Sequence, residues 1–483
     1  MSVASPLPKS ERGAFPSDES LTNQAFSRAA GALLIAGNSI RLLKDAEENY
    51  PAWLEAIDTA KERVHFESYI IHEDKTGRMF ADALIAKAKE GIPVRLIYDW
   101  LGCLGTASRA FWDQLREGGV EVRCYNPARW DSPFGWLSRD HRKTLCVDGR
   151  IGFVSGLCVG RMWVGDREKD VNPWRDTGVE LCGPSVSELD RAFASVWAMT
   201  GEPIPEDELA DSEPIEPQGE VALRIVGGFP GTGGMFRVDQ LIAELAKKRL
   251  WLTDAYYAGM TSYVHALRSA AQDGVDVRLL VPKATDAPLL KPLSRAGYRV
   301  LLEAGVRVFE WNGTMLHAKT AVADGRWARV GSTNLNIASW FGNCEMDVVI
   351  EDNSFAKSME EMFLADLQNA TEIVLNAKRK VSAPNQPRRK KTALKRRGGS
   401  SGRAAAGAVR IANVVSAAFT NRRVIEPVEA RITVGGGVLL VILAVLFAFY
   451  PRVIAYPVVL LSLWIAIALF YQGWKLHRSK AKR

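Results

Sequence analysis

The stretch FADALIAKAKEGIPVRLIYD (residues 80–99) is matched by YVHALRSAAQDGVDVRLLVP (residues 263–282) at a constant offset of 183 residues. Each copy has the pattern of an amphipathic helix that ends near glycine and is followed by a short apolar strand. The same order recurs in LREGGVEVRCYN (residues 115–126) and LLEAGVRVFEWN (residues 301–312). Because alternating helices and strands build layered α/β domains, the sequence predicts two related α/β halves in tandem.

Composition assigns the rest of the chain to linkers and terminal segments. With 483 residues, 47% of them apolar, the chain is long enough for about three structural units and is not mainly disordered. Its six cysteines show no zinc-ligand spacing and are predicted to be reduced thiols. The predicted units are an N-terminal extension (1–35), a first half (36–200), an acidic Pro-rich linker (201–218), a second half (219–372), a basic linker (373–425) and a C-terminal segment (426–483).

Charge is distributed very unevenly along the chain. Residues 373–425 carry 14 Lys and Arg with no acidic residue, and residues 426–483 carry a net +5. Since the whole chain carries +7, residues 1–372 carry a net charge of −12. An acidic body argues against nucleic acid as a partner, because nucleic-acid affinity comes largely from Lys and Arg contacts to phosphate. A basic segment beside a membrane favours anionic lipid.

The C-terminal segment predicts a transmembrane helical hairpin. Residues 432–450 and 453–474 are uncharged runs of 19 and 22 residues, each long enough for a hydrocarbon core of ~30 Å. Basic residues on both flanks place the two ends in the cytoplasm, and the N-terminus lacks a signal-peptide pattern. We therefore expect an inner-membrane protein with a cytosolic catalytic part. The alternative is a buried helical hairpin inside a soluble core.

A second repeat has the residues suited to catalysis. HRKTLCVDG (residues 141–149) and HAKTAVADG (residues 317–325) share a histidine, a lysine two residues later and an Asp-Gly pair. Strand alternation places the histidine and the lysine on one face, whereas Asp-Gly also fits a hairpin turn in which the aspartate is only structural. In the alternative interpretation, the histidine and the lysine lie on the solvent-facing side of an edge strand. This would explain one copy of the pattern, but it explains the presence of both copies poorly. The candidates are His141, Lys143 and Asp148 in the first copy and His317, Lys319 and Asp324 in the second.

The two copies form one site only if the halves pack about a pseudo-twofold axis. Such a site holds two imidazoles, of which one can act as nucleophile and the other as acid and base. Its two ammonium groups suit a phosphate, and no metal-ligand set or cofactor motif accompanies them. The sequence therefore predicts a phosphodiester enzyme that acts through a covalent phosphohistidine and leaves the substrate open.

These motifs resemble those of the phospholipase D superfamily, and more closely those of bacterial cardiolipin synthases, over residues 36–372. The second copy matches the family pattern completely, with Gly331, Ser332 and Asn334 after the His-x-Lys and Asp positions. In the first copy Cys158 stands where the family has asparagine. The resemblance extends to WRDT (residues 174–177) and NCE (residues 343–345), whose acidic residues look like the partners that orient the histidines. They are Asp176 and Glu345.

The resemblance implies a ping-pong phosphatidyl transfer without a metal or cofactor. One phosphatidylglycerol transfers its phosphatidyl group to a histidine and releases glycerol, and a hydroxyl of a second phosphatidylglycerol attacks this phosphatidyl-histidine to give cardiolipin. The other pair of lipids that the resemblance allows is phosphatidylglycerol with phosphatidylethanolamine. His141 is expected to be the nucleophile and His317 the acid. Charge on the phosphate would be stabilised by Lys143, Lys319, Ser332 and Asn334.

Two other classes of function stay open at this point. One is hydrolysis within the same superfamily, either a phospholipase D that makes phosphatidic acid or, less favoured by the acidic body, a nuclease. The other is a non-enzymatic membrane protein on a degenerate scaffold, for which Cys158 is the sole support. The sequence does not indicate an oligomeric state.

Overall fold

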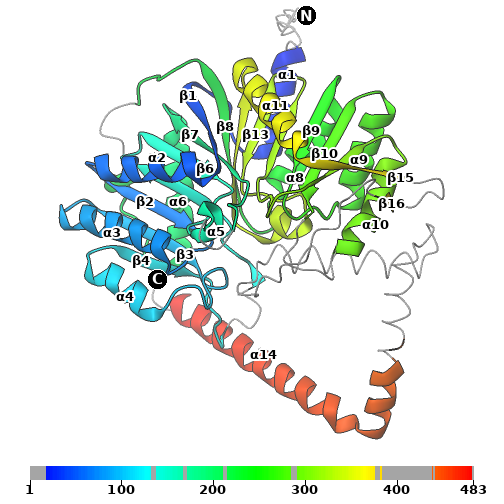
Figure 1. The fold of residues 1–483 in the computed structure, drawn as a ribbon. Coiled ribbons are helices and arrows are strands. Elements are labelled where there is room, and N and C mark those ends of the chain that lie inside the picture. The colour runs from blue at the N-terminus through cyan, green and yellow to red at the C-terminus, as the bar shows by residue number, and fades with distance from the viewer. Residues whose placement is uncertain are drawn as a thin grey trace, which may run out of the picture.

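The computed structural model describes residues 18–131, 137–166, 171–209, 215–283, 291–375, 381–382, 438 and 441–480. Both halves share one 16-stranded sheet that has helices on both of its faces (Figure 1). The strand order is β16-β15-β11-β10-β9-β12-β13-β14-β8-β1-β7-β6-β5-β2-β3-β4. The order of the first half recurs, reversed in direction, in the second half, as two copies related by a pseudo-twofold axis require. The predicted pair of tandem α/β halves is therefore confirmed.

The first half combines a parallel edge with an antiparallel centre. β2, β3 and β4 run parallel and are linked through helices, whereas β5, β6 and β7 are antiparallel neighbours. The helix α3 starts where the Asp74 carboxylate accepts the main-chain N–H of Thr76 at 3.0 Å. The strands are β1 (Ile35–Lys44), β2 (Val64–Ser68), β3 (Val94–Asp99), β4 (Glu121–Tyr125), β5 (Lys143–Val147), β6 (Ile151–Ser155) and β7 (Thr177–Cys182). The helices are α2 (Asp45–Thr59), α3 (Lys75–Lys89), α4 (Arg109–Glu117), α5 (Arg161–Val164), α6 (Val186–Thr200) and α7 (Glu206–Leu209).

The second half repeats this plan and extends it at one edge. β15 (Ala370–Leu375) pairs antiparallel with β11, and β16 (Val381–Ser382) pairs with β15. The repeated strands are β8 (Val221–Gly228), β9 (Arg249–Thr253), β10 (Asp276–Pro282), β11 (Arg307–Trp311), β12 (Thr320–Ala323), β13 (Trp327–Gly331) and β14 (Glu345–Glu351). The helices are α8 (Gly234–Leu245), α9 (Thr261–Gln272), α10 (Lys291–Leu302), η4 (Ala338–Gly342) and α11 (Asn353–Gln368).

The halves are joined through the antiparallel pair β1 and β8 at the centre of the sheet. Ile35 lies opposite Leu223, and Asn38 lies opposite Val221. The buried Asn38 amide donates to the Val221 carbonyl at 3.3 Å and accepts the main-chain N–H of Ser185 at 2.9 Å. This junction fixes the distance and angle between β5 and β12, which carry the two repeated motifs.

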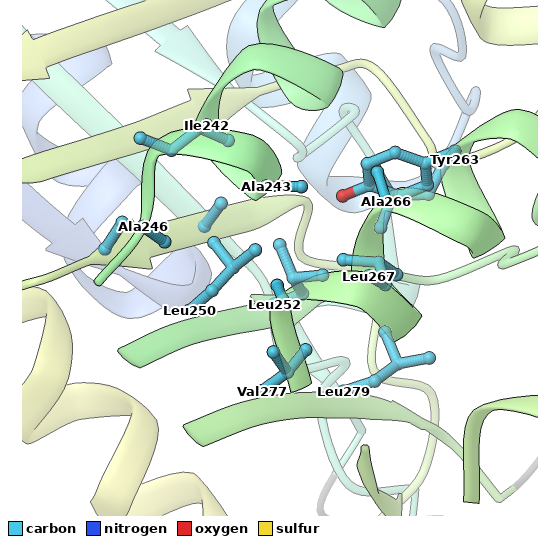
Figure 2. Packing of buried hydrophobic residues seen from close by; sticks show 14 of the residues in the cluster. Ile242, Ala243, Ala246, Leu250, Leu252, Tyr263, Ala266, Leu267, Val277 and Leu279 are labelled. Carbon is cyan, nitrogen blue, oxygen red and sulfur yellow. The ribbon is translucent and has the colours of Figure 1, made fainter. Parts of the chain in front are cut away.

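Each half has its own apolar core beneath its helices. In the second half, Leu250 and Leu252 of β9 pack with Leu267 of α9 and with residues of α8 and β10 (Figure 2). Burial of such a leucine side chain contributes about 1.5 to 3 kcal/mol to stability. The helix α1 (Asp18–Ala30), within the predicted N-terminal extension, adds Phe26 and Ala29 to this core. The extension is therefore partly helical and packs on the second half.

The C-terminal part that the structure describes is helical. Within the described ranges, no helix has both the length and the apolar character needed to cross a membrane. Of the first predicted span, residue 438 and residues 441–450 are described, whereas most of the basic linker lies outside the described residues. The second span falls in α14 (Pro451–Lys480). The transmembrane hairpin stays a prediction.

The helix α14 runs beside the first half and contacts it near residue 130 (Figure 1). The indole N–H of Trp464 donates to the Trp130 carbonyl at 2.5 Å, and the rings of Trp130 and Tyr471 lie 4.9 Å apart. Most described apolar side chains of α14 are exposed, with Leu460 at 66% and Phe470 at 79%.

Candidate active site

The two repeated histidines lie where the halves meet, just before β5 and β12. Asp140 forms a parallel bridge with Cys344, and Arg175 forms one with Leu316. The residue before each histidine is thus paired with the residue before a carboxylate of the opposite half. The main-chain N–H of His141 also donates to the Cys344 carbonyl at 2.9 Å, so the backbone itself sets the spacing at the site.

Each histidine is hydrogen-bonded to a carboxylate from the other half. His141 Nδ1 lies 2.9 Å from Glu345 Oε2, and His317 Nδ1 lies 2.8 Å from Asp176 Oδ2. All four side chains are buried. Neither half therefore contains a complete histidine–carboxylate pair, and the resemblance to known motifs did not reveal this crossed arrangement.

Both repeated lysines are buried beside their histidines. The Lys143 ammonium donates to the His141 carbonyl and lies 5.1 Å from the centre of the Tyr69 ring. The Lys319 ammonium donates to the His317 carbonyl in the same way. Each lysine also acts electrostatically on the histidine of the opposite half, so the four basic groups converge on one site that suits an anion.

Burial makes both histidines weak bases. Desolvation, reinforced by Lys143, lowers the pKa of His141 to about 4, although Glu345 opposes this shift. Desolvation and Lys319 lower the pKa of His317 to about 3. Both imidazoles are therefore neutral near pH 7 in the free protein.

The two carboxylates fix the tautomers of these histidines. Burial alone would raise the pKa of Glu345 and of Asp176, but the adjacent histidine and its hydrogen bond outweigh burial and lower it. An ionised carboxylate only accepts hydrogen bonds, so each Nδ1 carries the proton. The lone pair of each Nε2 then points away from the carboxylate and is available for chemistry.

The segments that follow β6 and β13 differ between the halves. Ser332 donates to Glu345 Oε2 at 2.5 Å and accepts the main-chain N–H of Met346 at 2.9 Å. Asn334 is buried, and its Oδ1 has no partner among the described residues. The structure thus places Ser332 on the carboxylate partner of a histidine and leaves the amide oxygen of Asn334 unused.

In the first half a tryptophan takes over the contact that Ser332 makes. Gly156 occupies the matching position, where a Cβ atom would come within 2.1 Å of Asp176 Oδ1. The indole N–H of Trp163 instead donates to Asp176 Oδ2 at 3.0 Å, and its ring centre lies 5.8 Å from that of His317. Sequence reasoning missed Trp163 because the short helix α5 carries no repeated motif.

Cys158, the departure from the family pattern, lies in the core of the first half. Its side chain is buried, and its carbonyl accepts the Tyr50 hydroxyl at 2.5 Å. Burial raises the pKa of the Cys158 thiol, so it is neutral and contributes no charge to a phosphate.

The two motif aspartates lie outside the site, which corrects their prediction as catalytic residues. The Asp148 carboxylate accepts the main-chain N–H groups of residues 61–63, and the Asp324 carboxylate those of residues 247–249, at 2.8 to 2.9 Å. Both residues have φ near +55°, as a hairpin turn after β5 or β12 requires. A five-residue strand at ~3.3 Å per residue separates Asp148 from Lys143.

The described residues hold no group of three or more His, Cys, Asp or Glu side chains that could bind a metal ion. The site instead consists of two crossed histidine–carboxylate pairs and two buried lysines.

Comparison with known proteins identifies the family. The family model for the cardiolipin synthase PLD-like domain matches residues 53–197 and 240–367. Cardiolipin synthase of Geobacillus sp. (strain WCH70) is 32% identical over 337 residues, which cover 69% of this chain and 67% of that protein. Cardiolipin synthase A of Pseudomonas syringae pv. syringae is 33% identical over 355 residues, or 72% and 73% of the two chains.

A solved structure agrees in fold. Phosphatidylserine synthase of Haemophilus influenzae superposes with a TM-score of 0.58 at 16% identity, over 73% of this chain and 91% of that one. The resemblance inferred from the sequence motifs is confirmed, and the chain belongs to the phospholipase D superfamily, within its family of cardiolipin synthase PLD-like domains.

Proposed function

We propose that this chain is a phosphatidyltransferase that makes cardiolipin from two phosphatidylglycerols, or from phosphatidylglycerol and phosphatidylethanolamine. The observation that carries the proposal is the pair of crossed histidine–carboxylate contacts beside two buried lysines. The curated relatives named cardiolipin synthase support phospholipid transfer over hydrolysis or nuclease activity.

In the first step, Nε2 of His141 attacks the phosphorus of phosphatidylglycerol, and the bond to the glycerol oxygen breaks. His317 donates a proton from Nε2 to that oxygen, so glycerol leaves as a neutral alcohol. His317 must therefore gain this proton when substrate binds. The phosphodiester anion favours this gain, because an opposite charge within ~4–6 Å stabilises the protonated form of a histidine.

In the second step, a hydroxyl of the second phosphatidylglycerol attacks the phosphatidyl-histidine. His317, now neutral, accepts the hydroxyl proton, and the phosphorus–nitrogen bond to His141 breaks. Cardiolipin forms, and the free enzyme returns when His317 releases this proton to solvent. When phosphatidylethanolamine is the lipid that forms the intermediate, ethanolamine leaves in place of glycerol.

The lysines and asparagine would stabilise charge on the phosphate during both steps. Phosphoryl transfer depends on cations and hydrogen-bond donors placed at the equatorial oxygens. The ammonium groups of Lys143 and Lys319 supply such charge without a metal, and Asn334 adds an amide.

Lipid mass spectrometry of the purified protein with phosphatidylglycerol as the sole lipid tests the reaction. We expect cardiolipin and free glycerol in equal amounts. Phosphatidic acid as the main product would contradict transfer and assign hydrolysis instead. Adding phosphatidylethanolamine with a labelled headgroup shows whether ethanolamine is also released.

The proposal includes a membrane location, with the catalytic halves on the cytoplasmic side. The exposed apolar side chains of α14 and the 14 basic residues of segment 373–425 support contact with an anionic bilayer. Each basic residue near such a surface contributes ~1 kcal/mol to binding.

A chain that ends after residue 382, so that β15 and β16 are kept, should keep its activity on detergent-dispersed lipid. Its activity on intact phosphatidylglycerol vesicles should fall greatly, because the proposed anchor is gone. Vesicle flotation and cardiolipin formation measure the two effects. Equal activity of both chains on vesicles would show that the tail is not the anchor.

The pH profile should show an alkaline limb caused by Lys319. Burial and the charge of Lys143 lower the pKa of Lys319 to about 8, so its positive charge is present below that pH and lost above it. We expect kcat/KM to fall through this pH in a profile from about pH 6 to pH 10, since this ratio reports the free enzyme. In Lys319→Arg, whose charge persists, the limb should disappear even if the rate is lower. A wild-type profile without the limb would contradict the role of Lys319.

A further inference from the structure

We propose that two buried arginines, Arg142 and Arg175, are positioning residues that hold the main chain of the two carboxylates and so aim them at the histidines. Two measurements test this inference. The kinetic measurement with lipid rests on the proposed function, whereas the NMR measurement of the histidine rings is independent of which lipid the protein transfers.

Arg142 lies between the first histidine and lysine of the motif and connects the halves. Its Nε donates to the Glu345 carbonyl at 3.1 Å, and its Nη2 donates to the Gly228 carbonyl at 3.0 Å, both in the second half. Its Nη1 donates to the Ala192 carbonyl of α6 at 2.9 Å. The fully buried guanidinium also lies 4.7 Å from the centre of the Phe229 ring. A rigid fork with these contacts fixes the backbone of Glu345.

Two buried acids lie beside Arg142. They are Glu67 and Asp140, which have no exposed surface. Burial raises the pKa of both carboxyls, and Arg142 partly offsets that rise. The Thr144 hydroxyl donates to Glu67 Oε2 at 3.1 Å.

Arg175 holds the other carboxylate with different partners. It forms a two-pronged ion pair with Asp366 of α11, with Nε at 2.9 Å and Nη2 at 2.9 Å. Its Nη1 donates to the main-chain carbonyl of Asp176 and lies 3.2 Å from Asp45 Oδ1. Asp45 in turn accepts the main-chain N–H of Asp176 at 2.8 Å. The backbone of Asp176 is thereby fixed on both sides.

The second half has the same strand pairing without an arginine at either position. The second half has Ala318 where the first has Arg142, and Cys344 where it has Arg175. Strands β12 and β14 nevertheless pair with their neighbours as β5 and β7 do. Both arginines come from the first half, and each reaches a residue of the second. Each arginine donates a hydrogen bond to the main-chain carbonyl of the acidic residue that binds one of the two histidines.

Conservative Lys substitutions separate positioning from general stability. Arg142→Lys and Arg175→Lys keep the charge but replace the fork with a single ammonium. Arg224→Lys is the matched control, because Arg224 is equally buried but binds Asn23 and Glu351, away from the histidines. The full-length protein in lipid-free detergent gives proton NMR signals for the histidine ring N–H groups that donate to carboxylates.

We expect Arg142→Lys to shift the ring signal of His141 alone, and Arg175→Lys to shift that of His317 alone. With lipid, each variant should lose about 10²-fold in kcat with KM within about twofold, as a catalytic group displaced by ~1 Å does. Arg224→Lys should lower Tm and leave both signals and kcat unchanged.

Unchanged ring signals in Arg142→Lys and Arg175→Lys, with a fall in Tm like that of Arg224→Lys, would overturn the inference. If Arg175→Lys does not fold, Asp366→Asn replaces it, since it keeps Arg175 but removes the ion pair. A shifted His317 signal in Asp366→Asn supports positioning, and an unshifted one contradicts it. A wild-type protein that forms no cardiolipin would contradict the proposed function and leave this test intact.

Discussion

His141→Ala is expected to abolish cardiolipin formation and the covalent intermediate, because no other group at that position can form the phosphorus–nitrogen bond. Loss of a nucleophile lowers kcat by about 10⁶ in a well-studied hydrolase. The measurement is acid-sensitive labelling of the protein by phosphatidylglycerol with a labelled phosphate. His265→Ala, on the exposed face of α9, is the matched control and should keep full activity.

His317→Ala should give a different result in the same assay. It removes the proton donor, whose contribution is typically a factor of about 10² to 10⁴. A phosphodiester with an activated leaving group needs no proton and should still label this variant. Label that persists in His141→Ala but vanishes in His317→Ala would show that the two roles are reversed.

Glu345→Gln is expected to lower kcat by about 10⁴, as loss of the carboxylate does in a Ser-His-Asp triad. The amide keeps the size of the side chain but no longer enforces the Nδ1–H tautomer of His141. Asp176→Asn should act in the same way on His317. Steady-state kinetics with phosphatidylglycerol in detergent measure both, and circular dichroism checks that the fold is retained.

The crossed arrangement also predicts that a fragment with only the first half is inactive. A chain that ends near Glu202 retains His141 but has lost Glu345, so it should be inactive by itself. Robust turnover by this fragment as a monomer would show that the site is not composite, whatever the effect of Glu345→Gln.

The repeat and the motif spacing were sufficient to predict the two halves and the histidine–lysine faces. Strand alternation over residues 143–147 places His141 and Lys143 together, and this is a local property of the chain. The Asp-Gly turns were also readable from the sequence, and Asp148 and Asp324 proved to be the turn residues that this local chemistry favours.

What could not be predicted depends on pairing between distant segments. The bridge between Asp140 and Cys344 spans about two hundred residues, and no periodicity in either segment specifies it. The acidic partners were named from the family resemblance, but which carboxylate faces which histidine follows from that bridge. Trp163 was missed for a similar reason, since its indole reaches Asp176 from a loop helix without a pattern.

The junction between β1 and β8 has a consequence for how the enzyme behaves on dilution. Two separate half-size chains would have to find each other before any histidine met its carboxylate, and their activity would fall steeply with protein concentration. Joining them in one chain makes that encounter intramolecular, so that it no longer depends on protein concentration. Specific activity should therefore stay constant down to nanomolar enzyme.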